Sequence, residues 1–408
     1  MPPQWRQSTM PVVADIPEEF ERALEAFRPH FGAPAFEHFK RYVLGLIVSE
    51  NLTVEGINRI FIQAKHPSSL NRFLTTGIWK QQEVNDTRID ILKIQGALGG
   101  KGWLAIDDTL THKTGKKIEG VGIYWDHSEK RYVLAHNIVT AEFVNPKGES
   151  HPLDFRLYLK EEQSREKRVP FKTKIDLAQE LVDDALQLGL EIQGALFDNW
   201  FASKDFIKFL QAKGLHWVTR LKSDRNIKIK GRYVAISQFA GTLPRESFRR
   251  VQTGDRIYQV FSKAVYLKGV GLVRILISYD NEGFSGSPAY FATDQIRWEG
   301  TRILKTYAKR WNIETFFRDS KQNLGLEDYQ LRDLWGIERH WYLILLAYSL
   351  QVSGLFGIDQ KPRRESPTLG DLITKTTRNV FSGLVGWIAL QLNRGRTPDE
   401  ICRIAYGF

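Results

Sequence analysis

The sequence predicts an α/β fold whose mixed sheet is flanked by helical regions toward both ends of the chain. Apolar residues recur at helical spacing up to about residue 94, and short apolar runs between 103 and 221 alternate with helical segments in the order βββ-α-β-α-β. From 227 to 292, alternating β-rich segments are separated by glycine-containing turns. With 408 residues, 42% of them hydrophobic, the chain is long enough for two or three domains with substantial cores.

The charge balance favours a polyanionic partner. The chain has 58 Lys and Arg against 47 Asp and Glu, a net charge of +11, which indicates nucleic acid first and an anionic membrane surface second. A membrane partner is disfavoured because the longest apolar stretch, 341–356, is interrupted by polar residues and is typical of a core helix. We therefore expect no membrane-spanning segment.

The N-terminus and the cysteine content predict the cellular location. Residues 1–20 lack a basic segment followed by an apolar block, so we expect no secretory signal. Cys402 is the single cysteine, which excludes an internal disulfide and a multi-cysteine zinc site and suits a reducing compartment. We expect a cytoplasmic protein, associated with the nucleoid in a prokaryote.

A helical region is expected over residues 1–98. Within it, 53–62 and 68–74 read as two short helices joined by the turn at Lys65-His66-Pro67, an arrangement similar to a DNA-reading helix pair. A helical bundle with no groove-reading role is the alternative interpretation.

The first part of the sheet domain is expected over residues 99–222. Its predicted strands are 103–106, the hairpin 120–125 and 131–139, then 192–197 and 216–221, with helices over 175–188 and 203–213. The first strand ends at Asp107-Asp108 and the fourth ends at Asp198. Two predicted strands thus each have an aspartate at their C-terminal end.

Three further regions complete the expected organisation. Residues 223–296 are predicted to be an all-β insertion, 297–335 the second part of the sheet domain, and 336–408 a helical C-terminal region. In the second part, 307–321 is predicted to be one helix with an apolar stripe at Ile313, Phe317 and Leu324.

Beside that stripe, Glu314 shares a helix face with cationic side chains. Arg310 and Lys321 flank it, and Tyr307 lies two turns before it. A salt bridge from Arg310 to Glu314, common on helix surfaces and worth about 0.3–0.5 kcal/mol, is the simplest interpretation. A carboxylate with these neighbours also suits a site for a metal ion and a phosphate.

Asp107, Asp198 and Glu314 together predict a metal site. Ligands collect outside the carboxyl ends of strands in an open sheet, and a few oxygen ligands with open positions suit Mg²⁺ or Mn²⁺. Two such ions about 3.5–4 Å apart support in-line displacement at phosphorus. The alternatives are strand-end turns with side-chain hydrogen bonds at Asp107 and Asp108 and a helix N-cap at Asp198.

The chain resembles the DDE insertion-sequence transposases, whose third acidic residue lies in a Tyr-x2-Arg-x3-Glu-x6-Lys signature. The matching residues are Tyr307, Arg310, Glu314 and Lys321, and Trp311 is also often present in these proteins. The resemblance extends over about residues 99–334. It implies a ribonuclease H-like catalytic core, interrupted by the β insertion ahead of the glutamate.

By this resemblance, Asp107, Asp198 and Glu314 would bind two Mg²⁺ ions, for which Mn²⁺ can substitute. Asp107 rather than Asp108 is the expected ligand, because adjacent strand residues point to opposite faces and Asp107 has the family's spacing to Thr109. Residues expected to contact DNA are Tyr307, Arg310, Lys321, Trp311 and Lys113. The basic run Arg165, Lys167, Arg168, Lys172 and Lys174 is either solvated charge or a further contact with the DNA backbone.

The activity implied is metal-dependent cleavage at transposon ends followed by transfer of the 3′-hydroxyl into target DNA. A homodimer would hold the paired terminal inverted repeats, with the helical N-terminal region reading DNA ends or contacting the second copy. A hairpin intermediate would need an aromatic residue to stack on a flipped base, for which Phe284, Trp298 and Trp200 are candidates. The alternatives are a ribonuclease H-like nuclease or resolvase without strand transfer, and a domesticated DNA-binding protein without catalysis. His112, His136 and His151 are interpreted as structural.

Overall fold

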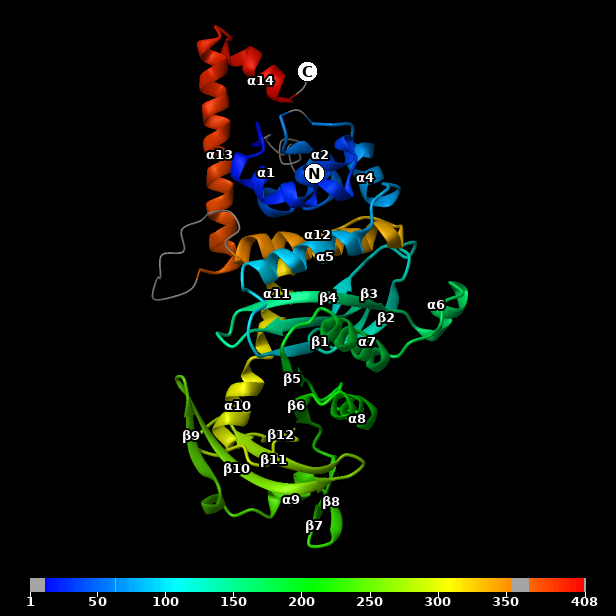
Figure 1. The fold of residues 1–408 in the computed structure, drawn as a ribbon, viewed down its shortest axis with the longest axis vertical. Helices are drawn as coiled ribbons and strands as arrows, with labels where there is room; N and C mark the ends of the chain where they lie inside the picture. The colour runs from blue at the N-terminus through cyan, green and yellow to red at the C-terminus, as the bar shows by residue number, and fades with distance from the viewer. Residues whose placement is uncertain (1–11, 63, 354–366, 407–408) are drawn as a thin grey trace. The chain divides into compact units, whose positions relative to one another are not determined.

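The computed structural model describes residues 12–62, 64–353 and 367–406 (Figure 1). The chain divides into two compact units. A helical unit contains Met1–Gln95, Thr111–Ala135 and Phe316–Phe408, and a sheet unit contains Gly96–Leu110 and His136–Thr315. Each unit is therefore assembled from segments that are distant in the sequence.

The helical unit is built around one buried helix, α12 (Leu334–Val352). Helices α2, α4 and α5 pack against it, and its residues from Gly336 to Gln351 are buried except for Glu338. It is the core helix expected from the apolar stretch at 341–356, of which residues 354–356 lie outside the described part. The other helices of this unit are α1 (Glu18–Leu24), η2 (Glu25–His30), α2 (Ala33–Val48), α3 (Val54–Arg59), α4 (Pro67–Thr75), α5 (Gln81–Ile94), α13 (Leu369–Asn393) and α14 (Pro398–Tyr406).

The expected pair of short helices is present as α3 and α4. Thr53 caps α3 by accepting a hydrogen bond from Gly56 N, and His66 caps α4 by accepting one from Ser68 N. Their role in reading DNA remains a prediction. Among the described residues, no helix combines the length and the apolar character needed to cross a membrane.

The sheet contains the strand order of a ribonuclease H-like core. Strands β4 (Ser150–Tyr158), β3 (Arg131–Val144), β1 (Gly102–His112), β5 (Ile192–Phe197) and β6 (His216–Leu221) are neighbours in that order. β1, β5 and β6 pair in parallel, whereas β3 and β4 pair antiparallel. The predicted fold class is therefore confirmed.

One strand of this core was missed by the sequence analysis. The expected hairpin exists as β2 (Gly122–Asp126) paired with the start of β3, but β3 continues to Val144 and then pairs with β4. β4 is hard to predict because it contains Pro152, and proline, which has no N–H for the hydrogen bonds between strands, argues against a strand. Pro152 lies opposite Glu142, where the register shifts.

The insertion extends the same sheet rather than forming a separate one. β12 (Ala289–Thr293) pairs antiparallel with β6, and the order continues through β11 (Gly271–Tyr279), β10 (Arg256–Leu267), β7 (Asn226–Ile229) and β8 (Arg232–Ala235), while β9 (Arg249–Thr253) also pairs with β10. The prediction of an all-β insertion was wrong in one respect. The helical turns α9 (Ile236–Gly241) and η3 (Arg245–Ser247) lie within it.

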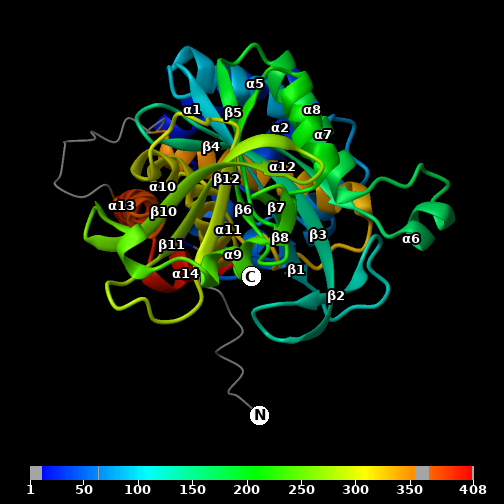
Figure 2. The ribbon, with the colours of Figure 1, turned by 90° about the horizontal axis from the view of Figure 1, so that it is seen from below.

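Several helices of the sheet unit pack against its strands. α6 (Glu161–Glu166) precedes α7 (Lys174–Gln187), which packs on β4, and α8 (Lys204–Ala212) packs on β6. α10 (Gly300–Ala308) lies across β6 and β10, as Figures 1 and 2 show. Its first residue is glycine because a Cβ there would lie 2.9 Å from Leu276 Cδ1.

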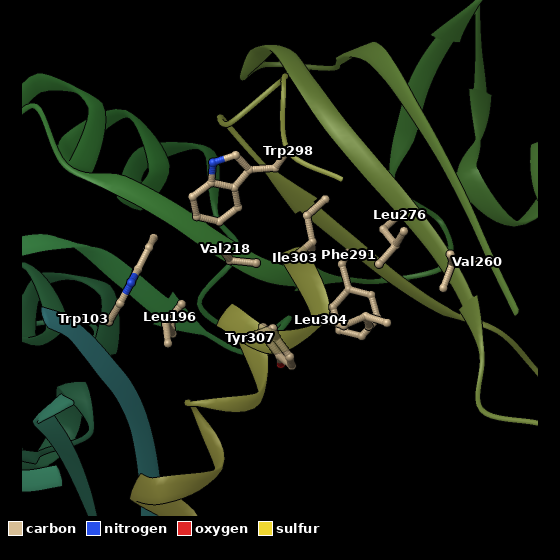
Figure 3. Packing of buried hydrophobic residues seen from close by; sticks show 10 residues of the cluster. All are labelled: Trp103, Leu196, Val218, Val260, Leu276, Phe291, Trp298, Ile303, Leu304 and Tyr307. Atoms are coloured by element: carbon tan, nitrogen blue, oxygen red, sulfur yellow. The ribbon is translucent and has the colours of Figure 1, made fainter. Parts of the chain in front are cut away.

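A continuous apolar core joins the ribonuclease H-like strands to the insertion (Figure 3). Leu196 and Val218 come from parallel strands, Val260 and Leu276 from the insertion, and Tyr307 from α10. Burial of apolar area stabilises such a cluster by about 25 cal/mol per Å². The helix that precedes the predicted glutamate is thus anchored on the sheet.

Candidate active site

Two predicted carboxylates lie side by side because of the register of β1 and β5. Ile106 and Phe197 are partners in this parallel pair. Asp107 directly follows Ile106, and Asp198 directly follows Phe197. Neighbouring strands are about 4.8 Å apart. The geometry therefore brings together two acidic residues that are 91 positions apart in the sequence.

The predicted single helix over 307–321 is interrupted. α10 ends at Ala308 and α11 (Trp311–Asn323) begins three residues later. Across the joint, the amides of Lys309, Arg310, Asn312 and Ile313 each bond the carbonyl three residues back, the tighter pattern of a 3₁₀ turn. The expectation of one rigid helix was therefore wrong, although Ile313, Phe317 and Leu324 are buried as predicted.

Arg310, at this joint, connects the acidic residues. Its Nη1 donates to Asp107 Oδ2 at 2.5 Å, its Nη2 donates to Glu314 Oε1, and its Nε donates to Tyr307 Oη at 3.1 Å. Arg310 is 6% exposed, whereas the side chain of Glu314 is 35% exposed. The local salt bridge expected from the sequence is real, but it is one part of a buried network.

Burial and charge repulsion perturb this network. Burial, together with the neighbouring charges of Asp198 and Asp108, raises the pKa of Asp107 to about 7 against the opposing effect of Arg310. Burial also raises the pKa of Tyr307 to about 12, so its hydroxyl stays protonated. The site thus holds more carboxylate charge than Arg310 alone neutralises, which is the condition under which a divalent cation binds well.

Asp198 is shaped by its own turn. Its Oδ1 accepts hydrogen bonds from Trp200 N at 2.8 Å and from Phe201 N at 3.3 Å, which form a side-chain-capped turn. The alternative interpretation of Asp198 as a helix N-cap was wrong, because Ser203 caps the next helix, α8. Among the described residues, Oδ2 of Asp198 has no hydrogen-bond donor. The turn therefore orients the carboxylate without using both of its oxygens.

Asp108 has different partners from Asp107. Its Oδ2 accepts from Asn137 Nδ2 at 2.9 Å and from Lys174 Nζ at 2.7 Å. Adjacent strand residues point to opposite faces, and the two aspartates accordingly bond different groups. Asp108 is neutralised by Lys174, while Asp107 joins Arg310 and Glu314.

The remaining predicted contacts have varied surroundings. Trp311 is 58% exposed, with the Arg310 guanidinium 5.6 Å from its ring centroid. In the helical unit, Lys321 Nζ lies 3.6 Å from a carboxylate oxygen of Glu327. Lys113 Nζ donates to the carbonyls of Glu327 and Tyr329, and burial lowers its pKa to about 8. The Lys113 ammonium therefore bonds backbone carbonyls of the protein itself.

The three aromatic candidates are now distinguishable. Trp298 is buried in the core, where it meets Trp103 edge-on, and Phe284 packs edge-on against Phe248 and Tyr279. Trp200 is 45% exposed and follows Asp198 by two residues, with Lys174 Nζ 4.7 Å from its ring centroid. Only Trp200, of the three, presents a free ring beside the carboxylates.

The helical unit contains one further cluster of potential metal ligands among the described residues. His112, Asp126 and Glu129 gather at the β2–β3 turn. His112 Nε2 lies 2.7 Å from Asp126 and its Nδ1 lies 3.5 Å from Glu129. The carboxylates face opposite ring nitrogens, an arrangement that suits a hydrogen-bonded histidine. His136 and His151 are buried.

The fold defines a class of protein: a ribonuclease H-like protein, here with a buried acidic cluster on its sheet. A sequence model described as "DDE superfamily endonuclease" matches residues 26–240, more than half of the chain, and one described as "Transposase DDE domain" matches 172–350. The chain belongs to the DDE superfamily of endonucleases, as its resemblance to DDE transposases predicted. No curated protein matches the sequence.

Proposed function

We propose that the protein is a cut-and-paste DNA transposase. It cleaves DNA at the ends of its element and transfers the 3′-hydroxyl into target DNA, with Asp107, Asp198 and Glu314 as the catalytic carboxylates. The observation that carries the proposal is the Arg310 network, because it links Asp107 on β1 to the glutamate of the family signature. The family to which the chain belongs supports the same chemistry.

The donor set fits divalent cations. All three side chains offer carboxylate oxygens, which suit Mg²⁺ and Mn²⁺. The pKa of Asp107 is raised mainly by burial, and the nearby carboxylates Asp198 and Asp108 contribute to the rise. Two bound ions would activate the attacking oxygen and stabilise the leaving oxygen during displacement at phosphorus. Asp107 would hold them from β1, Asp198 from the end of β5 and Glu314 from α11.

Arg310 and Tyr307 take a second role in this proposal. When cations neutralise the carboxylates, the guanidinium of Arg310 becomes available to donate to a DNA phosphate, a geometry that arginine favours. The Tyr307 hydroxyl, 3.1 Å from Arg310 Nε, orients that guanidinium. Trp200 is the aromatic residue that we assign to stacking on a flipped base beside the cut.

The proposed partners are double-stranded DNA and a second copy of the chain. Two protomers would hold two terminal inverted repeats, so that both ends are cut and joined together. Lys321 and Trp311 would contribute DNA contacts near Glu314. We propose that the protein acts in the cytoplasm, on the nucleoid.

Cleavage and joining of labelled duplex DNA test the proposal. The substrate carries the terminal repeats that flank the gene, and wild type is compared with Glu314→Gln in Mg²⁺, in Mn²⁺ and in EDTA. Metal-dependent joined products with wild type and none with the variant are expected. Cutting without joining would instead favour a nuclease, and metal-independent binding without cutting would identify a DNA-binding relic.

A further inference from the structure

A row of exposed side chains crosses four strands at one end of the sheet unit. Tyr233 on β8 is paired with Lys228 on β7, Lys228 with Tyr266 on β10, and Tyr266 with Leu272 on β11. Directly opposed residues of antiparallel strands point to the same face. Tyr233, Tyr266 and Leu272 are 50%, 55% and 45% exposed, and Lys228 is also exposed. We call these four residues the tyrosine–lysine row.

Tight turns hold the row in place. Lys230 and Gly231, between β7 and β8, both have positive φ, at 46° and 82°, as in the two-residue turns that suit hairpins. The turn between β10 and β11 is tied to β7 by a hydrogen bond from Lys268 N to Asn226 O at 2.9 Å. The row is therefore a fixed surface on a paired sheet.

The charge around the row has one sign. Segments 225–235 and 262–274 together contain seven Lys and Arg residues and no Asp or Glu. Lys268 Nζ lies 5.9 Å from the ring centroid of Tyr233, and neither Lys228 nor Lys268 has a carboxylate partner among the described residues. The surface is complementary to an anionic chain.

The row shares a sheet face with α10. Side chains alternate along β10, so Tyr266 points to the same side as Val260. Val260 belongs to the cluster that packs against Tyr307 of α10, as Figure 3 shows. Six residues of strand span about 20 Å. A DNA strand that leaves the carboxylate site along this face would run toward the row.

We propose that the tyrosine–lysine row binds a single strand of DNA. The rings of Tyr233 and Tyr266 stack on unpaired bases, while Lys228 and Lys268 contact the phosphates between them. Exposed aromatic residues with interleaved cations bind single strands in this way, since each base offers a ring face that is hidden inside a duplex. The proposal rests on the proposed function in that the strand held is one unpaired near the cut.

Edge protection is the competing explanation of the lysines. Charged side chains on an edge strand prevent pairing with another sheet, and β8 is an edge of this sheet. That explanation accounts for lysines on β7 and β8. It does not account for an exposed tyrosine on β10, which has strands on both sides.

Binding of labelled oligonucleotides to the full chain in EDTA tests the inference without any catalysis. A short oligothymidine and a duplex of equal length are compared by fluorescence anisotropy. The variant Tyr233→Ala with Tyr266→Ala is expected to bind the single strand roughly tenfold more weakly or worse, and the duplex with little change. Phenylalanine at both positions should preserve binding, because the stacking surface remains.

Tyr132→Ala is the matched control, since Tyr132 is 70% exposed on β3 outside the row. Photocrosslinking of a bromouracil oligonucleotide to wild type should map to Tyr233 or Tyr266, a readout that no folding defect affects. Equal single-strand affinity of the alanine variant and wild type would overturn the inference, as would crosslinks confined to other residues. If wild type binds the single strand but does not cleave DNA, only the proposed function is overturned.

Discussion

Arg310 Nη1 lies 2.5 Å from Asp107 Oδ2, although the two residues are 203 positions apart in the sequence. The same guanidinium bonds Glu314, so one cation occupies the place between two carboxylates that are proposed to hold metal ions. In the absence of metal, Arg310 therefore limits the repulsion within the acidic cluster. We therefore expect the stability of the site to depend on divalent cations.

Replacing Arg310 with methionine should destabilise the metal-free protein. Removing one partner of a buried ion pair costs about 3–5 kcal/mol, and proton uptake by Asp107, whose pKa is already about 7, offsets part of that cost. Mg²⁺ should restore much of the lost stability because the ions replace the missing positive charge. Urea unfolding in EDTA and in Mg²⁺ measures both effects.

The control is Lys305→Met, which removes an exposed cation from α10 and should change stability by no more than about 0.5 kcal/mol. Equal stability of the Arg310 variant and wild type in EDTA would show that the carboxylates do not depend on this residue.

Asp107→Asn and Asp108→Asn should separate the two neighbouring aspartates. Asp107→Asn removes a proposed metal ligand, so metal-dependent cleavage should fall below detection. Asp108 bonds Lys174 and Asn137 instead, and its replacement should reduce cleavage by no more than about 10–100-fold, as expected of a residue that orients a ligand. Cleavage rates over a Mn²⁺ titration give the comparison. Inactivity of only the Asp108 variant would reverse the assignment.

Trp298 and Trp200 should differ in what their removal affects. Trp298→Ala opens a cavity in the core and should cost about 3–5 kcal/mol of stability. Trp200→Ala should change stability little but reduce formation of cleaved DNA, because its exposed ring lies beside Asp198. Urea unfolding and cleavage assays on both variants test this; full cleavage by the Trp200 variant would remove it from the site.

Glu142 should make the protein less stable as pH rises. Burial raises its pKa from the ordinary value of 4.5 to about 8, so the folded protein holds this proton more tightly than the unfolded chain. Its contribution to stability is therefore greatest below pH 4.5 and is lost progressively between pH 4.5 and about 8. Glu142→Gln should be more stable than wild type at pH 8.5, with the difference disappearing toward pH 4.5.

Urea unfolding at several pH values measures this difference, with the exposed Glu162→Gln as control. A gain in stability that is the same at every pH would mean that Glu142 acts through packing rather than through its charge.

Local patterns in the sequence were sufficient for most secondary structure and for several residues that gather around Arg310. The apolar runs before Asp107 and Asp198 predicted two buried strands, and both exist. β5 ends just before Asp198 as predicted, but β1 continues to His112, so Asp107 lies within its strand rather than at the end. The spacing of Tyr307, Arg310 and Glu314 predicted that they act together, and they are hydrogen-bonded. Short-range periodicity predicts these features because burial selects residues at regular intervals along one strand or helix.

The tertiary structure decided what those residues bond. The sequence determined that Asp107 follows the apolar run of β1 and that Asp198 follows β5, but the register of Ile106 with Phe197 placed them side by side. The sequence also placed Arg310 one turn before Glu314. It did not reveal that the helix breaks between α10 and α11, where Arg310 makes a third bond, to Asp107. Pairing of β6 with β12 and the hidden strand β4 also depended on partners far along the chain. Such long-range choices are set by packing and by the pairing of buried polar groups, which no local window of sequence contains.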